Sequence, residues 1–193
     1  MLYKVLPKKI EKVFIDLDDT LVDFIGTAFK LFNRSSITSD SDIKKFWSFI
    51  EKEDNNKSMW KKINSNGPRW WKELPKLPWA DRLVEAANNA CSDVIILTSP
   101  GNGPGSGVAA QGKIEWSLKN FGSNELVLAY KKYMCSSPGS ILIDDWDKFT
   151  VPWSERGGTA LTVKRPWTNT GYDVEDIIQA LNKYGDLNRM RVK

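Results

Sequence analysis

Three aspartates follow a short apolar run near the start of the chain: Asp16, Asp18 and Asp19 come directly after Val13–Ile15. Apolar β-branched and aromatic residues favour a buried strand, whereas carboxylates stay out of a core unless they are paired or bind a cation. Residues i and i+2 at the end of a strand point to the same side, so Asp16 and Asp18 can face one site together. Because two close carboxylates repel, and because carboxylate oxygens suit Mg²⁺, the pattern predicts a hard-cation site at the end of this strand.

Two more apolar runs end in polar side chains of the same kind. Ile141–Ile143 leads into Asp144 and Asp145, and Val94–Leu97 leads into Thr98, Ser99 and a proline. Ligands of open α/β sheets bind beyond the carboxyl ends of the strands. We therefore expect the three groups to meet at one edge of a sheet, although each alone would also fit a solvated turn.

Composition restricts the chemistry that the chain can perform. The 193 residues are 41% hydrophobic and 27% charged, which is typical of a globular protein of one domain with room for a small inserted subdomain. The absence of histidine excludes Ser-His-Asp catalysis, Cys-His catalysis and His-ligated metals. With two cysteines, no signal peptide and no long apolar stretch, the sequence predicts a cytoplasmic protein that does not bind membranes.

The order of the predicted elements indicates an α/β fold with a mostly parallel sheet and helices on both faces. Strands are expected at residues 12–17, 94–98, 126–128, 141–143 and 159–163, and helices at residues 22–33, 42–53, 81–90, 109–121 and 173–184. Residues 26–80 interrupt the alternation, because they are helical and rich in tryptophan. We expect residues 1–25 and 81–193 to form the core domain, with residues 26–80 as a helical cap inserted after the first strand.

Four finer predictions concern loops and helix faces. Asn66–Pro68 is expected to be a turn, and the glycine-rich stretch Gly101–Gly107 a mobile connection without a phosphate-binding role. In the helix at residues 109–121, Ile114, Leu118 and Phe121 are expected to face inward, and Lys113 to be solvated.

The motifs together resemble those of the haloacid dehalogenase-like (HAD) phosphatases, with a Rossmann-like fold. The resemblance covers residues 12–165 and rests on Asp16-x-Asp18-x-Thr20, Thr98 after an apolar strand, a lysine, and Asp144-Asp145. Within that superfamily the chain is similar to the 5'(3')-deoxyribonucleotidases and their phage and bacterial relatives. The segments that carry this likeness read DLDDTLVDF, ILTSP, KIEWSLKNFG and PGSILIDD, together with Phe46-Trp47. One departure is Asp19, where the family usually has glycine.

The resemblance implies roles for the acidic residues and a bound Mg²⁺. Asp16 would be the nucleophile and Asp18 the general acid and base. Mg²⁺ would be held by Asp16, the backbone carbonyl of Asp18, and Asp145, with Asp144 alongside. Asp19 is expected only to cap the following helix.

The resemblance also implies residues that bind the phosphoryl group and the rest of the substrate. Thr98 and Lys132 would contact the phosphoryl group, with Ser99 beside Thr98, while Lys131 is the alternative to Lys132. Phe24, Phe46 and Trp47 map onto the side of the pocket that takes a nucleobase, and Trp60 is a further candidate because a flat aromatic wall suits stacking.

These residues predict a Mg²⁺-dependent phosphomonoesterase that acts on nucleoside monophosphates through an aspartyl-phosphate. A phosphatase for sugar phosphates or for nucleic-acid ends remains an alternative, as does a binding module for single strands. The expected partner is a small phosphate ester rather than nucleic acid, and relatives often form homodimers.

Overall fold

The computed structural model describes residues 2–32, 39–103, 105–168 and 170–191. Within them, five parallel strands form one sheet in the order β3-β2-β1-β4-β5. The strands are β1 (Lys12–Ile15), β2 (Val94–Thr98), β3 (Glu125–Leu128), β4 (Ser140–Asp144) and β5 (Thr159–Thr162). In the register of the sheet, Ile15 lies between Ile96 and Ile143. The predicted strands and the parallel sheet are confirmed.

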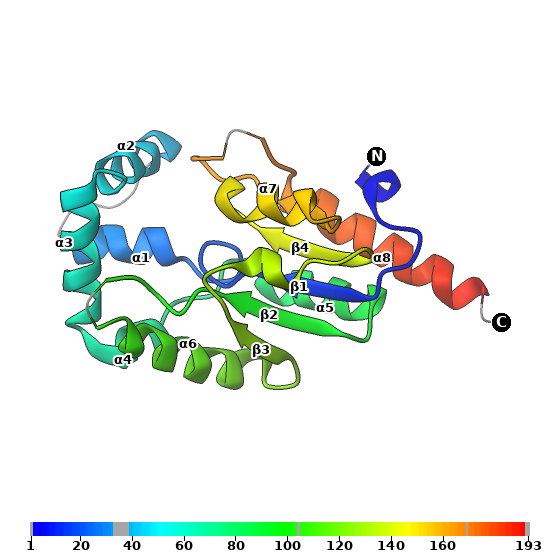
Figure 1. The fold of residues 1–193 in the computed structure, drawn as a ribbon, viewed down its shortest axis with the longest axis horizontal. Coiled ribbons are helices and arrows are strands. Elements are labelled where there is room, and N and C mark those ends of the chain that lie inside the picture. The colour runs from blue at the N-terminus through cyan, green and yellow to red at the C-terminus, as the bar shows by residue number, and fades with distance from the viewer. Residues whose placement is uncertain (1, 33–38, 104, 169, 192–193) are drawn as a thin grey trace.

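The helices cover both faces of this sheet, which confirms the predicted α/β Rossmann-like class (Figure 1). Among the described residues the α-helices are α1 (Phe24–Leu31), α2 (Asp40–Ile50), α3 (Glu53–Asn64), α4 (Gly67–Lys72), α5 (Ala80–Ala90), α6 (Ser106–Phe121), α7 (Asp147–Glu155) and α8 (Val174–Arg191). Two 3₁₀ helices accompany them, η1 (Leu2–Val5) and η2 (Lys132–Cys135). No helix in these ranges has both the length and the apolar composition to cross a membrane.

The side chains of β1 alternate between two apolar clusters. Val13 and Ile15 pack in the cluster that includes α5 and α8. Phe14 points to the other face, where its ring meets Trp153 of α7 edge-on at 5.1 Å. Because both faces are covered, the strands read as almost continuous apolar runs, which is why they could be located from sequence.

Helices α1–α4, called the cap helices below, lie beyond the ends to which the strands run (Figure 1). Their apolar side chains, such as Phe46, Met59 and Trp71, belong to the same continuous cluster as Ile15 of the sheet. The predicted division into a core and a cap at residues 26–80 stays a prediction, with its first boundary falling inside α1.

The expected turn at residues 66–68 is the start of α4. Gly67 has a positive φ of 70° and Pro68 occupies the first turn of the helix. Proline is favoured there because its missing N–H would have no partner inside the helix. The same residues that signal a turn therefore also begin this short helix.

The prediction of which side of α6 is buried was wrong for Ile114 and Leu118, whereas Phe121 packs against the core as expected. Ile114 and Leu118 are 38% and 65% exposed, whereas Lys113 and Trp116 are buried. The reason is the close approach of α4, since a Cβ on Gly112 would lie 2.4 Å from the carbonyl oxygen of Pro68. Trp116 Nε1 also donates to the carbonyl of Leu74 at 2.7 Å. These contacts turn the lysine inward and leave the aliphatic side chains in solvent.

The glycine-rich connection before α6 has backbone angles that explain its composition. Gly101, Gly103 and Gly105 have φ values of 106°, 71° and 79°. Residues other than glycine rarely adopt such φ values. The expected mobility of this connection stays a prediction.

Candidate active site

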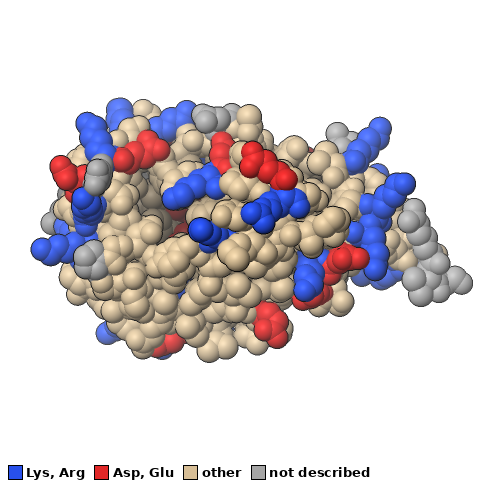
Figure 2. Space-filling view, in the orientation of Figure 1, with Lys and Arg blue, Asp and Glu red and all other residues tan. Residues whose placement is uncertain are grey.

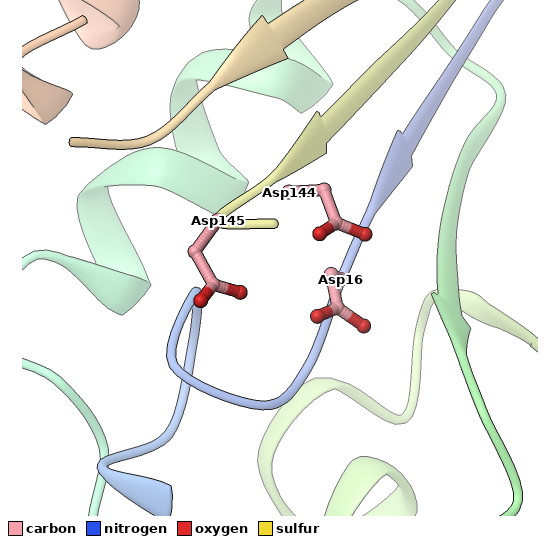
Figure 3. Close-up of side chains that lie close together, drawn as sticks. All are labelled: Asp16, Asp144 and Asp145. Atoms are coloured by element: carbon pink, nitrogen blue, oxygen red, sulfur yellow. The ribbon is translucent and has the colours of Figure 1, made fainter. Parts of the chain in front are cut away.

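The three carboxylates of Asp16, Asp144 and Asp145 converge where β1 and β4 end (Figure 3). Each offers an oxygen, and these oxygens all lie within 4.8 Å of one another. The chain builds β1, β2 and β3 outward in one direction and then returns to the other side of β1 for β4. Ligands of open parallel sheets bind at such a reversal. The topology therefore brings together acids that are more than a hundred residues apart in sequence.

Lys132 bridges two of these acids at the start of η2. Its Nζ lies 2.5 Å from Asp16 Oδ1 and 2.7 Å from Asp144 Oδ2, and its side chain is 1% exposed. Burial opposes its charge, but Asp144 and Asp16 outweigh burial and hold the pKa of Lys132 above its ordinary value. Lys131 is exposed and does not line the cavity described below. Of the two predicted lysines, the fold thus brings only Lys132 to the acids.

Lys113 pairs with Asp18, contrary to the prediction that it is solvated. Its Nζ lies 2.5 Å from Asp18 Oδ2, and the lysine side chain has no exposed surface. The same Nζ lies 3.2 Å from Thr98 Oγ1 and donates to the carbonyl of Ser99 at 2.9 Å. Lys113 therefore joins the loop after β1 to the end of β2, and its position on the buried side of α6 explains why it is inside.

The two hydroxyl residues at the end of β2, Thr98 in the strand and Ser99 after it, differ in their surroundings. Thr98 is fully buried and is not among the residues that line the cavity, whereas Ser99 lines it. The hydroxyl of Thr98 lies against Lys113, so in this structure it orders the lysine.

Asp19 helps to cap α1, whose N-cap residue is Asp23, but it also faces Arg165, so capping is not its only role. Its Oδ1 accepts from the backbone N–H of Ile25 at 3.1 Å, and it lies 3.5 Å from Nη2 of Arg165. Asp19 has a φ of 56°, in the left-handed region that favours glycine and tolerates aspartate. This conformation explains why an aspartate can stand where the resembling family has glycine.

The acids outnumber the bases that contact them. Asp16, Asp18, Asp19, Asp144 and Asp145 face the cations of Lys113, Lys132 and Arg165, which leaves two negative charges among these described side chains. Burial, assisted by repulsion from Asp16 and opposed by Lys132, raises the pKa of Asp144 to about 7. Burial also raises the pKa of Asp145 well above its usual range, with repulsion from Asp19 and Asp144 adding to it.

These observations fit a divalent cation. Three close, buried carboxylate oxygens form the oxygen-only set that Mg²⁺ prefers. A charge of +2 would balance the excess of negative charge and remove the repulsion that raises the pKa values of Asp144 and Asp145.

A cavity with a volume of about 470 Å³ opens above the acids, between the cap helices and the sheet (Figure 2). Asp16, Asp18 and Asp145 line one part of it, together with Lys132. Apolar side chains of the cap line another part: Phe24, Trp47, Ile50, Met59 and Trp60. The cavity thus joins the acid cluster to an aromatic wall.

Phe46 lies apart from this wall, although it was expected on the substrate side. It is 2% exposed and packs edge-on against Phe29 with ring centroids 5.2 Å apart. Phe46 and Trp47 are adjacent on α2, so successive side chains point in different directions and only Trp47 reaches the cavity.

Sequence reasoning missed Lys113, Arg165 and Trp167. Trp167 donates from Nε1 to Asp145 Oδ2 at 2.9 Å, and the Arg165 guanidinium lies 5.1 Å from its ring. Both residues follow β5, far from any motif. The available signal for Lys113 was its place at the start of KIEWSLKNFG, one of the segments that carry the resemblance.

No family model matches the chain, and no curated protein sequence does. Solved structures do match. One is the HAD-hydrolase YfnB from Bacillus subtilis, bound to magnesium, with a TM-score of 0.58, 14% identity and coverage of 91% of this chain and 100% of that one. The fold is that of HAD hydrolases. A dehalogenase with an intermediate complex has a TM-score of 0.58, 13% identity and coverage of 86% and 90%. A HAD-superfamily hydrolase of subfamily IA from Geobacter sulfurreducens has a TM-score of 0.55, 9% identity and coverage of 91% and 100%.

Proposed function

We propose that this protein is a Mg²⁺-dependent phosphomonoesterase that hydrolyses nucleoside monophosphates through an aspartyl-phosphate. The observation that carries the proposal is that Asp16, Asp18 and Lys132 line the same cavity as the aromatic wall. The HAD-hydrolase fold supports it, as does the magnesium bound to YfnB, whose structure this chain resembles.

Asp16 is the proposed nucleophile. Its carboxylate oxygen attacks phosphorus, an O–P bond to Asp16 forms, and the bond from phosphorus to the leaving oxygen breaks. Lys132 holds Asp16 by a 2.5 Å contact, which fixes the direction of the carboxylate and offsets its charge. Water then attacks the same phosphorus atom and releases phosphate, which restores Asp16.

Asp18 is the proposed proton donor and acceptor. Burial raises its pKa, although Lys113 opposes the shift. Among the described residues, the buried Oδ1 of Asp18 has no hydrogen-bond partner, while Lys113 holds Oδ2. This free oxygen is available to protonate the leaving oxygen and later to take a proton from the attacking water.

Mg²⁺ would be held by Asp16, Asp145 and the backbone carbonyl of Asp18, with Asp144 alongside. When bound, it supplies positive charge that allows an anionic carboxylate to approach an anionic phosphate. Ser99, which lines the cavity, would bind a phosphoryl oxygen, and Thr98 would keep Lys113 in position.

The aromatic wall is the proposed site for the base. Phe24, Trp47 and Trp60 all line the cavity, and aromatic rings stack on any nucleobase. A sugar phosphate has no flat face to offer such a wall, so the wall favours a nucleotide over a sugar phosphate.

Nucleic-acid ends are a second candidate, favoured by the distribution of charge. Residues 26–80 contain 11 Lys and Arg against 6 Asp and Glu, a net charge of +5, whereas the whole chain has +4. The remainder of the chain is therefore slightly acidic, and the positive charge gathers on the segment beside the cavity. A basic segment of this kind attracts phosphate backbones.

Phosphate release from a panel of substrates tests both candidates. The panel contains nucleoside monophosphates, sugar phosphates and 5'- or 3'-phosphorylated oligonucleotides, with and without Mg²⁺, and Asp16→Asn is the control. We expect Mg²⁺-dependent release from mononucleotides that the control abolishes. Faster release from oligonucleotides, decreasing with salt, would select the second candidate, and release from sugar phosphates alone would refute the role of the wall.

A further inference from the structure

Trp47 of the cap contacts two tryptophans that are hydrogen-bonded to Asp144 and Asp145. The ring of Trp47 on α2 stacks on Trp167, with centroids 5.0 Å apart and planes 9° apart. The ring of Trp146 meets Trp47 edge-on at 5.5 Å. Trp167 Nε1 donates to Asp145 Oδ2, and the backbone N–H of Trp146 donates to Asp144 Oδ1, both at 2.9 Å. Helix α2 therefore reaches the acids through these rings.

The indole of Trp167 is held on several sides. Its ring also lies 5.1 Å from the guanidinium of Arg165, which in turn lies 5.5 Å from the ring of Trp79 and 3.5 Å from Asp19. The side chain of Arg165 is 10% exposed. Since an indole is rigid and planar, the ring that stacks on the cap and the N–H that orients Asp145 cannot move independently.

We propose that Trp167 is a positioning residue that couples the seating of α2 over the cavity to the orientation of Asp145. The proposal rests on the proposed function in one respect, since Asp145 is there one of the residues that would hold Mg²⁺. A hydrogen bond to the far oxygen of a metal-binding carboxylate sets its orientation, and loss of such a partner weakens metal binding. A displaced α2 removes the stacking partner of Trp167 and so weakens its hold on Asp145 Oδ2, which leaves the carboxyl with the long 3.5 Å contact from Thr20 Oγ1 to Oδ1.

The coupling is reciprocal. If the position of α2 changes the affinity of the Asp145 site for Mg²⁺, then the Asp145 site must favour one position of α2 by the same free energy. Loss of the Asp145 carboxyl must therefore loosen α2, and loss of the Trp47 ring must weaken Mg²⁺ binding although Trp47 donates no hydrogen bond to an acid of the cluster. A merely structural role for the aromatic stack would lower overall stability without either effect.

The first test is Mg²⁺ binding by calorimetry in the absence of substrate. We expect Trp47→Leu to weaken binding about fivefold or more, within the usual range of coupling energies. Trp167→Phe, which keeps a ring but loses the N–H, should also weaken it, and Trp47→Leu with Trp167→Leu should bind no worse than Trp167→Leu alone. The matched control is Trp70→Leu, because Trp70 is a half-buried cap tryptophan that does not line the cavity. Unchanged Mg²⁺ affinity in Trp47→Leu would overturn the proposal.

The second test needs no metal and uses hydrogen exchange of the α2 backbone amides. Asp145→Ala and Trp167→Phe should both speed exchange in α2, because each removes the hydrogen bond between Trp167 Nε1 and Asp145 Oδ2, and Trp167→Leu should speed it further because it also removes the stacked ring. Unchanged exchange in Asp145→Ala would overturn the coupling. A wild-type protein that binds no Mg²⁺ would instead remove the metal from the proposed function, and the coupling would then stand or fall on this second test.

Discussion

Replacement of Lys132 by methionine should strongly destabilise the protein, while the same change at Lys131 should not. Lys132 is 1% exposed and pairs with Asp16 and Asp144, whereas Lys131 is exposed. Removing one partner of a buried ion pair costs about 3–5 kcal/mol, because a buried charge is left without compensation. An exposed substitution away from such a pair stays within about 0.5 kcal/mol. The adjacent lysines therefore form a matched pair.

The cost of Lys132→Met should also depend on pH in a definite direction. The pKa of Asp144 is already raised to about 7, with Lys132 opposing the rise, so loss of the lysine raises it further. At pH 5 the Asp144 carboxyl is neutral in both proteins and adds no difference. Above about pH 7 the Asp144 carboxyl of the variant, unlike that of the wild type, must either stay protonated or bear a buried charge without a partner. This difference adds up to about 1.4 kcal/mol per pH unit to the loss of stability.

Thermal unfolding of metal-free protein at pH 5 and pH 8 measures both effects. With roughly 2–4 °C per kcal/mol for a chain of this size, the melting temperature of Lys132→Met should fall by about 6–20 °C at pH 5, and by a few degrees more at pH 8. If the variant folds only at pH 5, Mg²⁺-dependent phosphate release can be compared there, where a loss of about 10² in kcat is expected for one electrostatic contact. Equal stability of Lys132→Met and Lys131→Met at pH 8 would refute the buried bridge.

Three further predictions concern neighbouring groups. Lys113→Met should destabilise the protein by about 2–3 kcal/mol. This is somewhat below the usual cost of removing one partner of a buried ion pair, because the Asp18 side chain is 20% exposed. Calorimetric unfolding measures the change, and Lys119→Met on the same helix is the control. The stability of the metal-free protein should fall as pH rises from about 4 to about 7, because Asp144 binds a proton more tightly when folded (pKa about 7) than when unfolded; thermal melts in EDTA that show the opposite trend would contradict this. Asp19→Gly should cost about 3 kcal/mol, because the N–H of Ile25 and the largely buried guanidinium of Arg165 both lose a partner, although glycine accommodates the φ of 56°. Urea midpoints should place Asp19→Leu lower still, because leucine neither caps nor tolerates this φ.

The amino-acid sequence determined the strands, their parallel class and the acids at their ends. Apolar runs such as Ile141–Ile143 report burial on both faces directly, and a carboxylate after such a run marks the strand end. Because parallel strands share one carboxyl edge, Asp16 and Asp144 could be placed near each other without coordinates. Capping by Asp19 is equally local, acting on Ile25 six residues away.

Only the tertiary structure decided which charged and aromatic side chains turn inward. Lys113 meets Asp18 across 95 residues of sequence, and Trp167 meets Asp145 beside a ring from α2. Hydrophobic periodicity predicts that apolar residues are buried, so it places a lysine in solvent. It cannot detect that a carboxylate from a distant element pairs with that lysine. It also cannot separate Phe46, which packs within the cap, from its neighbour Trp47, which faces the cavity. Such choices depend on pairings between distant segments, where the free energy of a buried charge is set by its partner rather than by its neighbours in sequence.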